Sequence, residues 1–219
     1  MKGPGFQRAR SAAAKYLRET AILEAARRLG GERGIRQVTL TEIAEAVGMH
    51  KSALLRYFET REEIFLRLTA EDWREWSGAL RSELESLADP APAAIAGVFA
   101  GTLAARGAFC DLLAQAPLNL ERNVSVDAVR AFKLVTHAEV DAIVAVVRRM
   151  QPALSERAVI DVIAAATALS GAFWQMATPG PEIAALYRSD PRLSHAVFGV
   201  EGRVQRILEA TLEGMLERT

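Results

Sequence analysis

Residues 40–59 carry hydroxyl and cationic side chains at a spacing that suits contact with nucleic acid. They read LTEIAEAVGMHKSALLRYFE. If the segment after Gly48 is a helix, its outer face holds Lys51, Ser52 and Arg56. Lysine and arginine can pair with guanine O6 and N7 or with phosphate oxygens, and serine can bond to either. These residue types therefore predict recognition of a DNA major groove.

The neighbouring residues fit the helix-turn-helix that such recognition needs. Ala44 lets two short helices cross closely, Gly48 permits a tight turn, and Leu54 fills the angle between the helices. Thr39 and Glu42 match a capping box, which satisfies free N–H groups at a helix start. The same spacing also fits an αα-hairpin inside an ordinary helical bundle, and the pattern alone leaves that alternative open.

Charge is divided unequally along the chain. The 219 residues include 27 Lys/Arg and 27 Asp/Glu, so the formal net charge is zero. Residues 1–68 hold 13 Lys/Arg against 8 Asp/Glu, a net +5, whereas residues 69–219 hold 14 against 19, a net −5. Such a division of charge indicates that the basic N-terminal part binds nucleic acid. The distribution weakens the αα-hairpin alternative.

Helical periodicity dominates the sequence, and no β-alternation of useful length appears. Half of the residues are hydrophobic, which is enough for a packed core and excludes a disordered chain. We predict an all-α fold of roughly nine helices, with an N-terminal three-helix domain over residues 1–67 and a larger helical domain over residues 68–219. Three prolines predict an irregular link near residues 179–191. The expected helices span about 11–30, 40–47, 51–58, 61–87, 92–105, 109–115, 125–150, 155–177 and 201–217.

An ordered set of motifs runs through residues 18–68. It comprises ILEAARRL at 22–29, Gly34, VTLTEIAEAVGM at 38–49, YF at 57–58 and REEIF at 61–65. In this order the motifs resemble the TetR/AcrR family of bacterial transcription regulators. The resemblance implies a homodimer whose two heads read the halves of a pseudo-palindromic DNA operator. It also implies that the C-terminal domain holds the dimer interface and a pocket, in which a small apolar ligand acts as the effector.

The function that follows is a DNA-binding transcriptional regulator, a repressor that the apolar ligand releases from its operator. The alternative is a helical module that senses a ligand or a protein but does not bind DNA. Salt dependence separates the two, since contacts to phosphate release counterions and weaken steeply with salt.

Three residues depart from the family pattern. His50 stands where serine or threonine usually caps the recognition helix, and Leu55 stands where a phosphate-contacting tyrosine is common. Arg61 replaces a frequent lysine and keeps its charge. The resemblance carries the family's DNA contacts over to Thr39, Lys51 and Tyr57 and also to four neighbours, and together these form the predicted DNA-binding set. That set is Thr39, Thr41, His50, Lys51, Ser52, Arg56 and Tyr57.

The N-terminal arm holds Lys2, Arg8, Arg10 and Lys15. A basic arm can enter a minor groove or strengthen phosphate attraction. Chain termini are usually loose, so a solvated tail is the favoured interpretation.

Aromatic and apolar residues of the C-terminal domain could line a ligand pocket or fill a core. The family resemblance predicts a pocket without choosing its walls. The candidate ligand-binding residues are Trp73, Trp76, Phe99, Leu103, Phe132, Phe173 and Trp174.

Small residues on the helix at 155–177 would let another helix approach closely. Together with the last helix, they predict a four-helix interface between two copies of the chain. The candidate interface residues are Ala164, Ala168, Gly171, Ala172, Ile207 and Leu208.

Other classes of function lack a signal. No glycine-rich phosphate loop, HExxH, GxSxG or paired-cysteine pattern occurs, so we expect neither an enzyme nor a cofactor. His137 and Asp141 could pair on a solvated helix face, but too few further ligands exist for a metal site. The lone Cys110 fits a reducing cytoplasm. The uncharged stretch between residues 161 and 182 is interrupted by polar residues, which favours a buried helix over a membrane span.

Overall fold

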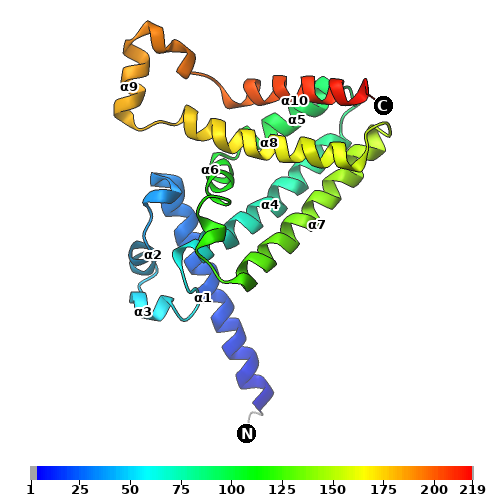
Figure 1. Ribbon diagram of the computed structural model, residues 1–219. Helices are drawn as coiled ribbons and strands as arrows, with labels where there is room; N and C mark the ends of the chain where they lie inside the picture. Colours follow the sequence, from blue (N-terminus) through cyan, green and yellow to red (C-terminus); the bar gives the residue numbers. More distant parts are fainter. Residues whose placement is uncertain (1–3, 219) are drawn as a thin grey trace.

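The chain is all-α, as the sequence predicts (Figure 1). A computed structural model describes the backbone of residues 4–218 and the side chains of residues 13–218. Within that part, ten α-helices and three short 3₁₀ helices occur, and no strand. The elements are α1 (Pro4–Arg33), η1 (Ile35–Gln37), α2 (Leu40–Ala46), α3 (Lys51–Leu54), α4 (Arg61–Glu85), α5 (Pro92–Ala104), α6 (Gly107–Gln115), η2 (Leu120–Arg122), α7 (Val126–Met150), α8 (Glu156–Ala177), α9 (Pro181–Ser189), η3 (Pro191–Ala196) and α10 (Val200–Leu216).

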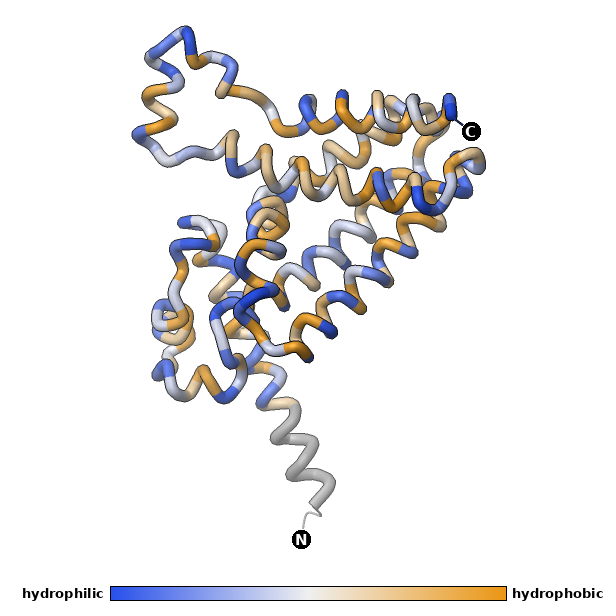
Figure 2. The backbone as a smooth tube through the Cα atoms, in the orientation of Figure 1, coloured by the Kyte–Doolittle hydropathy of each residue, from blue (hydrophilic) through white to orange (hydrophobic). Residues whose placement is uncertain are grey.

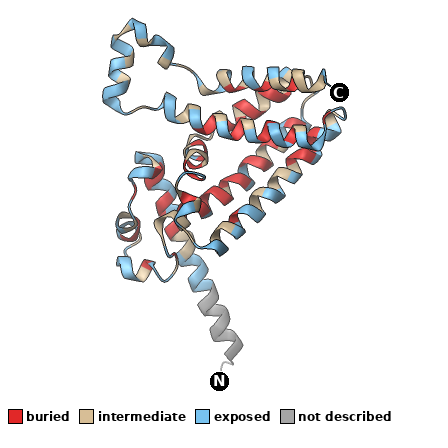
Figure 3. Cartoon of the chain, viewed as in Figure 1, coloured by how far each residue is buried: buried red, intermediate tan, exposed pale blue. Residues whose placement is uncertain are grey.

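Helix α4 connects the small N-terminal head to the rest of the molecule. The head comprises α1, α2 and α3, and α1 packs against α4. In the body, α7 lies along α4, α8 packs on α6, and α10 packs on both α5 and α8 (Figure 1). One hydrophobic cluster extends from Ile22 in α1 through α4 to Leu212 in α10. The apolar faces of these helices are turned inward, where Figure 3 shows the buried residues.

Helix α1 is longer than the sequence predicts. It begins at Pro4 rather than near Ser11, and it continues through the Gly30-Gly31 pair to Arg33. Gly30 allows η1 to approach the helix closely, since a Cβ there would come to 3.3 Å from Ile35 Cγ1. The stop comes at Gly34, whose φ of +83° favours glycine. The backbone from Pro4 onward is therefore helical rather than disordered, while residues 13–18 are exposed, as expected of a solvated tail.

Basic residues of the N-terminal arm fall partly outside the description. Lys2 lies outside the described residues, and so do the side chains of Arg8 and Arg10. The Lys15 side chain is exposed and forms an i,i+4 pair with Glu19, with 3.6 Å between Nζ and Oε1.

The predicted irregular link contains a helix, α9. Pro181 occupies its first turn, where the missing N–H of proline costs no hydrogen bond. Neither α9 nor η3 contains a buried residue. This segment projects away from the body between α8 and α10, and Figure 2 shows apolar and polar residues alternating along it.

Helix α8 is the one single helix of the described chain that is long and apolar enough by composition to cross a membrane. Helices α5 and α6 reach the same criterion only together, and they are bent by 88°. Core helices of soluble proteins have the same composition, and α8 packs against α5, α6, α7 and α10.

Candidate functional site

Helix α2 begins with the predicted capping box, which is confirmed. The Thr39 hydroxyl accepts a hydrogen bond from the Glu42 backbone N–H at 3.3 Å, and the Thr39 backbone N–H donates to Glu42 Oε2 at 2.8 Å. Arg33 Nη1 lies 2.7 Å from Glu42 Oε1 and connects the end of α1 to α2. The hydrogen bond from the Thr39 backbone, followed by those from its hydroxyl and from Arg33, lowers the pKa of Glu42 to about 2.

Helices α2 and α3 form the predicted helix-turn-helix. Gly48 adopts a φ of +65° in the turn between them, a conformation that glycine adopts without strain. Ala44 and Leu54 are fully buried where the two helices meet, as their predicted roles require. Both residues join the core that α1 and α4 complete, so the outer face of α3 is left to solvent.

Helix α3 is shorter than predicted and ends at Leu54 rather than Phe58. Its last turn tightens, because the backbone N–H groups of Arg56 and Tyr57 bond to carbonyls three residues earlier, at 3.3 and 2.8 Å. At the other end His50 is the N-cap, with Nδ1 accepting from the Ser52 backbone N–H at 3.4 Å and lying 2.9 Å from Ser52 Oγ. Histidine therefore takes the capping position that serine or threonine usually holds.

The structure brings the predicted DNA-binding residues together on the head. Six of them are exposed and Tyr57 is half-buried. Leu55, at the position of the customary tyrosine, is 43% exposed and supplies no polar atom there. The exposed residues are Thr39, Thr41, His50, Lys51, Ser52 and Arg56.

Two arginines beside this surface were not among the predicted contacts. Arg36 is exposed and lines a shallow hollow together with Thr39 and Lys51, and no sequence signal singled it out. Arg61 donates through Nε to the Val38 carbonyl at 2.5 Å and through Nη2 to the Ile35 carbonyl at 2.7 Å. Arg61 thus connects the start of α4 to the segment before α2, which is a structural role.

Polar contacts also join the head to the body. Arg27 of α1 hydrogen-bonds to the buried carboxylate of Asp72 and lies 3.3 Å from Glu71 Oε2. Burial raises the pKa of Asp72, and the hydrogen bond from Arg27 opposes that shift. Asp111 of α6 accepts from the Ile35 backbone N–H at 2.9 Å and from Gln175 Nε2 at 2.8 Å. One carboxylate therefore touches η1 and α8 at once.

Four of the candidate ligand-binding residues belong to the closed core of the body. Trp73 and Trp76 meet edge to face at 5.2 Å between ring centroids, and Phe109 packs 5.9 Å from each. Trp76 Nε1 donates to Thr102 Oγ1 at 3.1 Å, which satisfies its buried N–H. Phe99 and Leu103 are fully buried in the same core.

The seven candidates do not converge on one pocket. Phe173 packs on Phe198 with 5.7 Å between ring centroids, and the Trp174 ring covers Gly107 on α6. Trp174 also borders a groove of about 510 Å³ between the head and the body. Of the seven, Phe132 alone lines the cavity between α4 and α7.

Cys110 lies inside the same core as the tryptophans. It is fully buried, and burial raises the pKa of its thiol to about 12. The Sγ atom donates to the Leu103 carbonyl at 3.3 Å. A thiol in this setting stays protonated and serves packing.

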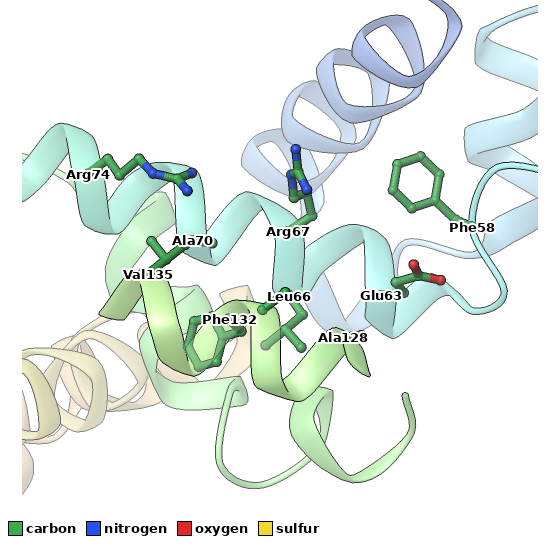
Figure 4. Close-up of a pocket in the computed structure, with 10 residues that line it drawn as sticks. Phe58, Glu63, Leu66, Arg67, Ala70, Arg74, Ala128, Phe132 and Val135 are labelled. Carbon is green, nitrogen blue, oxygen red and sulfur yellow. The ribbon is translucent and has the colours of Figure 1, made fainter. Parts of the chain in front are cut away.

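The cavity between α4 and α7 has a volume of about 240 Å³ (Figure 4). Its wall is mainly apolar, and two arginines of α4 stand at its rim. It reaches the head at Phe58, which follows α3 in the chain. The lining residues are Phe58, Glu63, Leu66, Arg67, Ala70, Arg74, Ala128, Ala131, Phe132 and Val135.

The candidate interface residues divide into exposed and buried ones. Ala164, Ala168 and Ala172 are exposed along α8, and Ile207 is 38% exposed on α10. Gly171 and Leu208 are buried within the chain, so the expectation that they face a second copy is wrong. A Cβ at Gly171 would come to 3.0 Å from the Ala114 backbone nitrogen, and the small residue therefore serves the packing of α8 on α6.

His137 and Asp141 pair on the exposed face of α7. The distance between Nδ1 and Oδ2 is 2.8 Å, and the side chains are 76% and 58% exposed. This is the solvated pair that the helical spacing predicts.

Comparisons with known proteins identify both parts of the chain. Residues 22–68 match the family described as bacterial regulatory proteins, tetR family. Residues 70–219 match the family described as tetracyclin repressor-like, C-terminal domain. No curated protein matches the chain in sequence.

Solved structures share the fold at low identity. The fatty acid degradation regulator FadR from Bacillus halodurans is 14% identical with a TM-score of 0.57, covering 89% of this chain and 98% of its own. Thermus thermophilus FadR, a TetR-family repressor solved with lauroyl-CoA, is 19% identical with a TM-score of 0.60, covering 90% and 94%. The TetR-family regulator PfmR, also from Thermus thermophilus, is 18% identical with a TM-score of 0.54, covering 88% and 97%.

Proposed function

The chain belongs to the TetR family of bacterial regulatory proteins, and from that premise we propose that this DNA-binding transcriptional regulator is a cytoplasmic repressor. It binds a pseudo-palindromic operator as a homodimer and is released by a small ligand with an apolar body. We divide the chain into a DNA-binding domain at residues 1–67 and a ligand-binding and dimerisation domain at residues 68–219.

The observation that carries the DNA-binding part is the polar outer face of the helix-turn-helix. Lys51, Ser52 and Arg56 are exposed on or directly after α3, while Ala44 and Leu54 are buried beneath them. A helix held in this way presents its side chains to a major groove without disturbing the core. We propose Thr39, Thr41, His50 and Tyr57 as the further contacts, with Arg36 added at the edge.

DNA binding by the full chain tests this assignment. The measurement is fluorescence anisotropy of a labelled duplex from the region upstream of the chain's own gene, at several salt concentrations. The variant Lys51→Ala/Arg56→Ala should lose affinity and reduce the salt slope by about 2, roughly one for each lost phosphate contact.

The matched control removes the same charge elsewhere. Arg148 and Arg157 are exposed on α7 and α8, far along the chain from the head, and Arg148→Gln/Arg157→Gln should bind like the parent protein. Unchanged affinity in the Lys51/Arg56 variant would refute the recognition-helix assignment. It would favour the alternative of a sensing module that does not bind DNA.

The homodimer is proposed from the exposed side of α8 and α10. Ala164, Ala168 and Ala172 lie four residues apart, which places them on one stripe of α8, and Ile207 is exposed on the neighbouring α10. Small residues allow two helices to approach closely, and two such helices from each copy would make a four-helix interface. Light scattering at micromolar concentration should give twice the 23.8 kDa chain mass, and a strictly monomeric species would contradict the proposal.

A further inference from the structure

The cavity between α4 and α7 combines an apolar wall with two cationic side chains. We infer that it binds an amphiphilic anion, a molecule with a short apolar body and one carboxylate, and that this molecule is the effector. The inference rests on the proposed function and specifies the chemistry of its ligand.

The apolar wall sets the size of the ligand body. Leu66 and Ala70 of α4 are buried and lie beside Phe132 and Val135 of α7 in the cavity lining (Figure 4). A volume of about 240 Å³ corresponds to about eight water volumes, at about 30 Å³ each. A body of roughly eight to ten non-hydrogen atoms would fill it, as a medium-length acyl chain does.

The charge at the rim sets the head group. Arg67 and Arg74 are seven residues apart, about two helical turns, and so lie on the same side of α4 (Figure 4). Arg74 has neither a hydrogen bond nor an ion pair with any described residue, and Arg67 has only a distant pair, 3.8 Å from Glu71 Oε1. Glu71 also lies 3.3 Å from Arg27, so its charge is shared.

Glu63 is the one carboxylate among the lining residues. Its Oε2 already accepts a hydrogen bond from the Glu59 backbone N–H at 2.6 Å. Two arginines against one engaged carboxylate leave the cavity with a net positive charge. A guanidinium suits a carboxylate because it can donate two parallel hydrogen bonds.

The position of the cavity links its occupant to the head. Phe58 directly follows the tight turn that ends the helix-turn-helix, and it is part of the cavity lining. Glu63 anchors the Glu59 backbone in the connection to α4, whose N-cap is Thr60. A ligand that touches Phe58 and Glu63 therefore acts on the residues that set the angle between the recognition helix and α4.

The binding test uses the full chain without DNA and three probes that share one apolar chain. Isothermal titration calorimetry compares octanoate, octanol and octylammonium. Octanoate should bind at least tenfold more tightly than octanol, and octylammonium should bind most weakly. Equal affinity for octanoate and octanol would overturn the proposed ligand class.

Two pairs of variants locate the site. Arg67→Gln/Arg74→Gln should lose the preference for octanoate and keep octanol binding, whereas Arg148→Gln/Arg157→Gln should behave like the parent. Ala131→Phe fills the cavity from an exposed position of α7 and should abolish binding of all three probes. Ala138→Phe, two turns further along α7 and outside the lining, is its control. Octanoate binding that survives both Arg67→Gln/Arg74→Gln and Ala131→Phe would place the ligand elsewhere.

A separate experiment tests the effector role. Octanoate should release the labelled upstream duplex from the parent protein and leave the complex of the Ala131→Phe variant intact. If octanoate binds the cavity and the DNA stays bound, the ligand class stands and the effector role is wrong. If the parent protein binds no DNA at all, the proposed function fails, and the calorimetry still decides the ligand class.

Discussion

The predicted site residues of the head are mostly exposed, whereas those of the body are mostly buried. In the head, six of the seven candidate DNA contacts are exposed, and the core beneath them consists of other residues. In the body, five of the seven candidate ligand contacts are buried, and four of these lie in the closed core. A helix-turn-helix is a local motif whose spacing separates inner from outer faces. An aromatic residue carries no such information, because only its packing partners decide whether it fills a core or lines a cavity.

The largest expected effect comes from the closed core of the body. Trp76→Ala removes a fully buried ring that packs on Trp73, Phe99 and Phe109, together with the hydrogen bond that Trp76 donates to Thr102. It should lower the free energy of unfolding by about 3–5 kcal/mol, as truncations of buried aromatic residues do. Urea unfolding followed by circular dichroism measures it. A loss of unfolding free energy below about 1 kcal/mol would indicate that Trp76 lines a pocket rather than fills the core. The contrast between head and body would then fail.

Gly171→Val probes the small residue that the body buries. The added side chain would meet the Ala114 backbone, and overpacking of this kind costs about 1–3 kcal/mol. The control Ala145→Val adds bulk at an exposed position of α7, outside the proposed dimer interface, and should leave the stability almost unchanged. Thermal unfolding at two protein concentrations separates a loss of packing within the chain from a loss of dimerisation, because only the latter depends on concentration. An effect of Gly171→Val that appeared only as weaker dimerisation would return Gly171 to the interface.

Thr39→Ala tests the local order of the head. It removes the hydroxyl that caps α2 and should lower the free energy of unfolding by about 0.5–2 kcal/mol. Thr39→Ser keeps the capping oxygen and should unfold in urea at almost the parent midpoint. Equal losses in the two variants would mean that the methyl group, rather than the cap, stabilises α2.

The smallest expected effect is a pH dependence at Glu42. The pKa of this carboxylate is lowered from 4.5 to about 2, first by the hydrogen bond from the Thr39 backbone. Its ionised form therefore stabilises the folded head above pH 4.5, and that stabilisation is lost as the pH falls toward 2. The gap in unfolding midpoint between parent and Glu42→Gln should narrow over this range. The control Glu45→Gln, at an exposed position of the same helix, should differ from the parent by the same amount at every pH. A difference between parent and Glu42→Gln that did not change with pH would contradict the prediction.

Predictions from sequence succeeded where the information is local. The capping box at Thr39, the Gly48 turn and the buried Ala44 and Leu54 all follow from residues fewer than twenty positions apart. They failed where tertiary packing decides the outcome. Gly30 stays inside α1 where Ile35 packs against it, and the burial of Gly171 depends on Ala114. The helix α9 was missed because three prolines suggested an interruption, although Pro181 suits a first helical turn.

The sequence by itself determined the all-α class, the helix-turn-helix and the polar face that α3 presents. Those features depend on periodicity, capping and turn chemistry, which act over a few residues. Only the tertiary structure decided that the tryptophans close into a core and that the open cavity lies between α4 and α7, beside the head. It also placed Arg67 and Arg74 at the rim of that cavity. Burial and cavity shape depend on which helices pack together, and no single stretch of the chain contains that information.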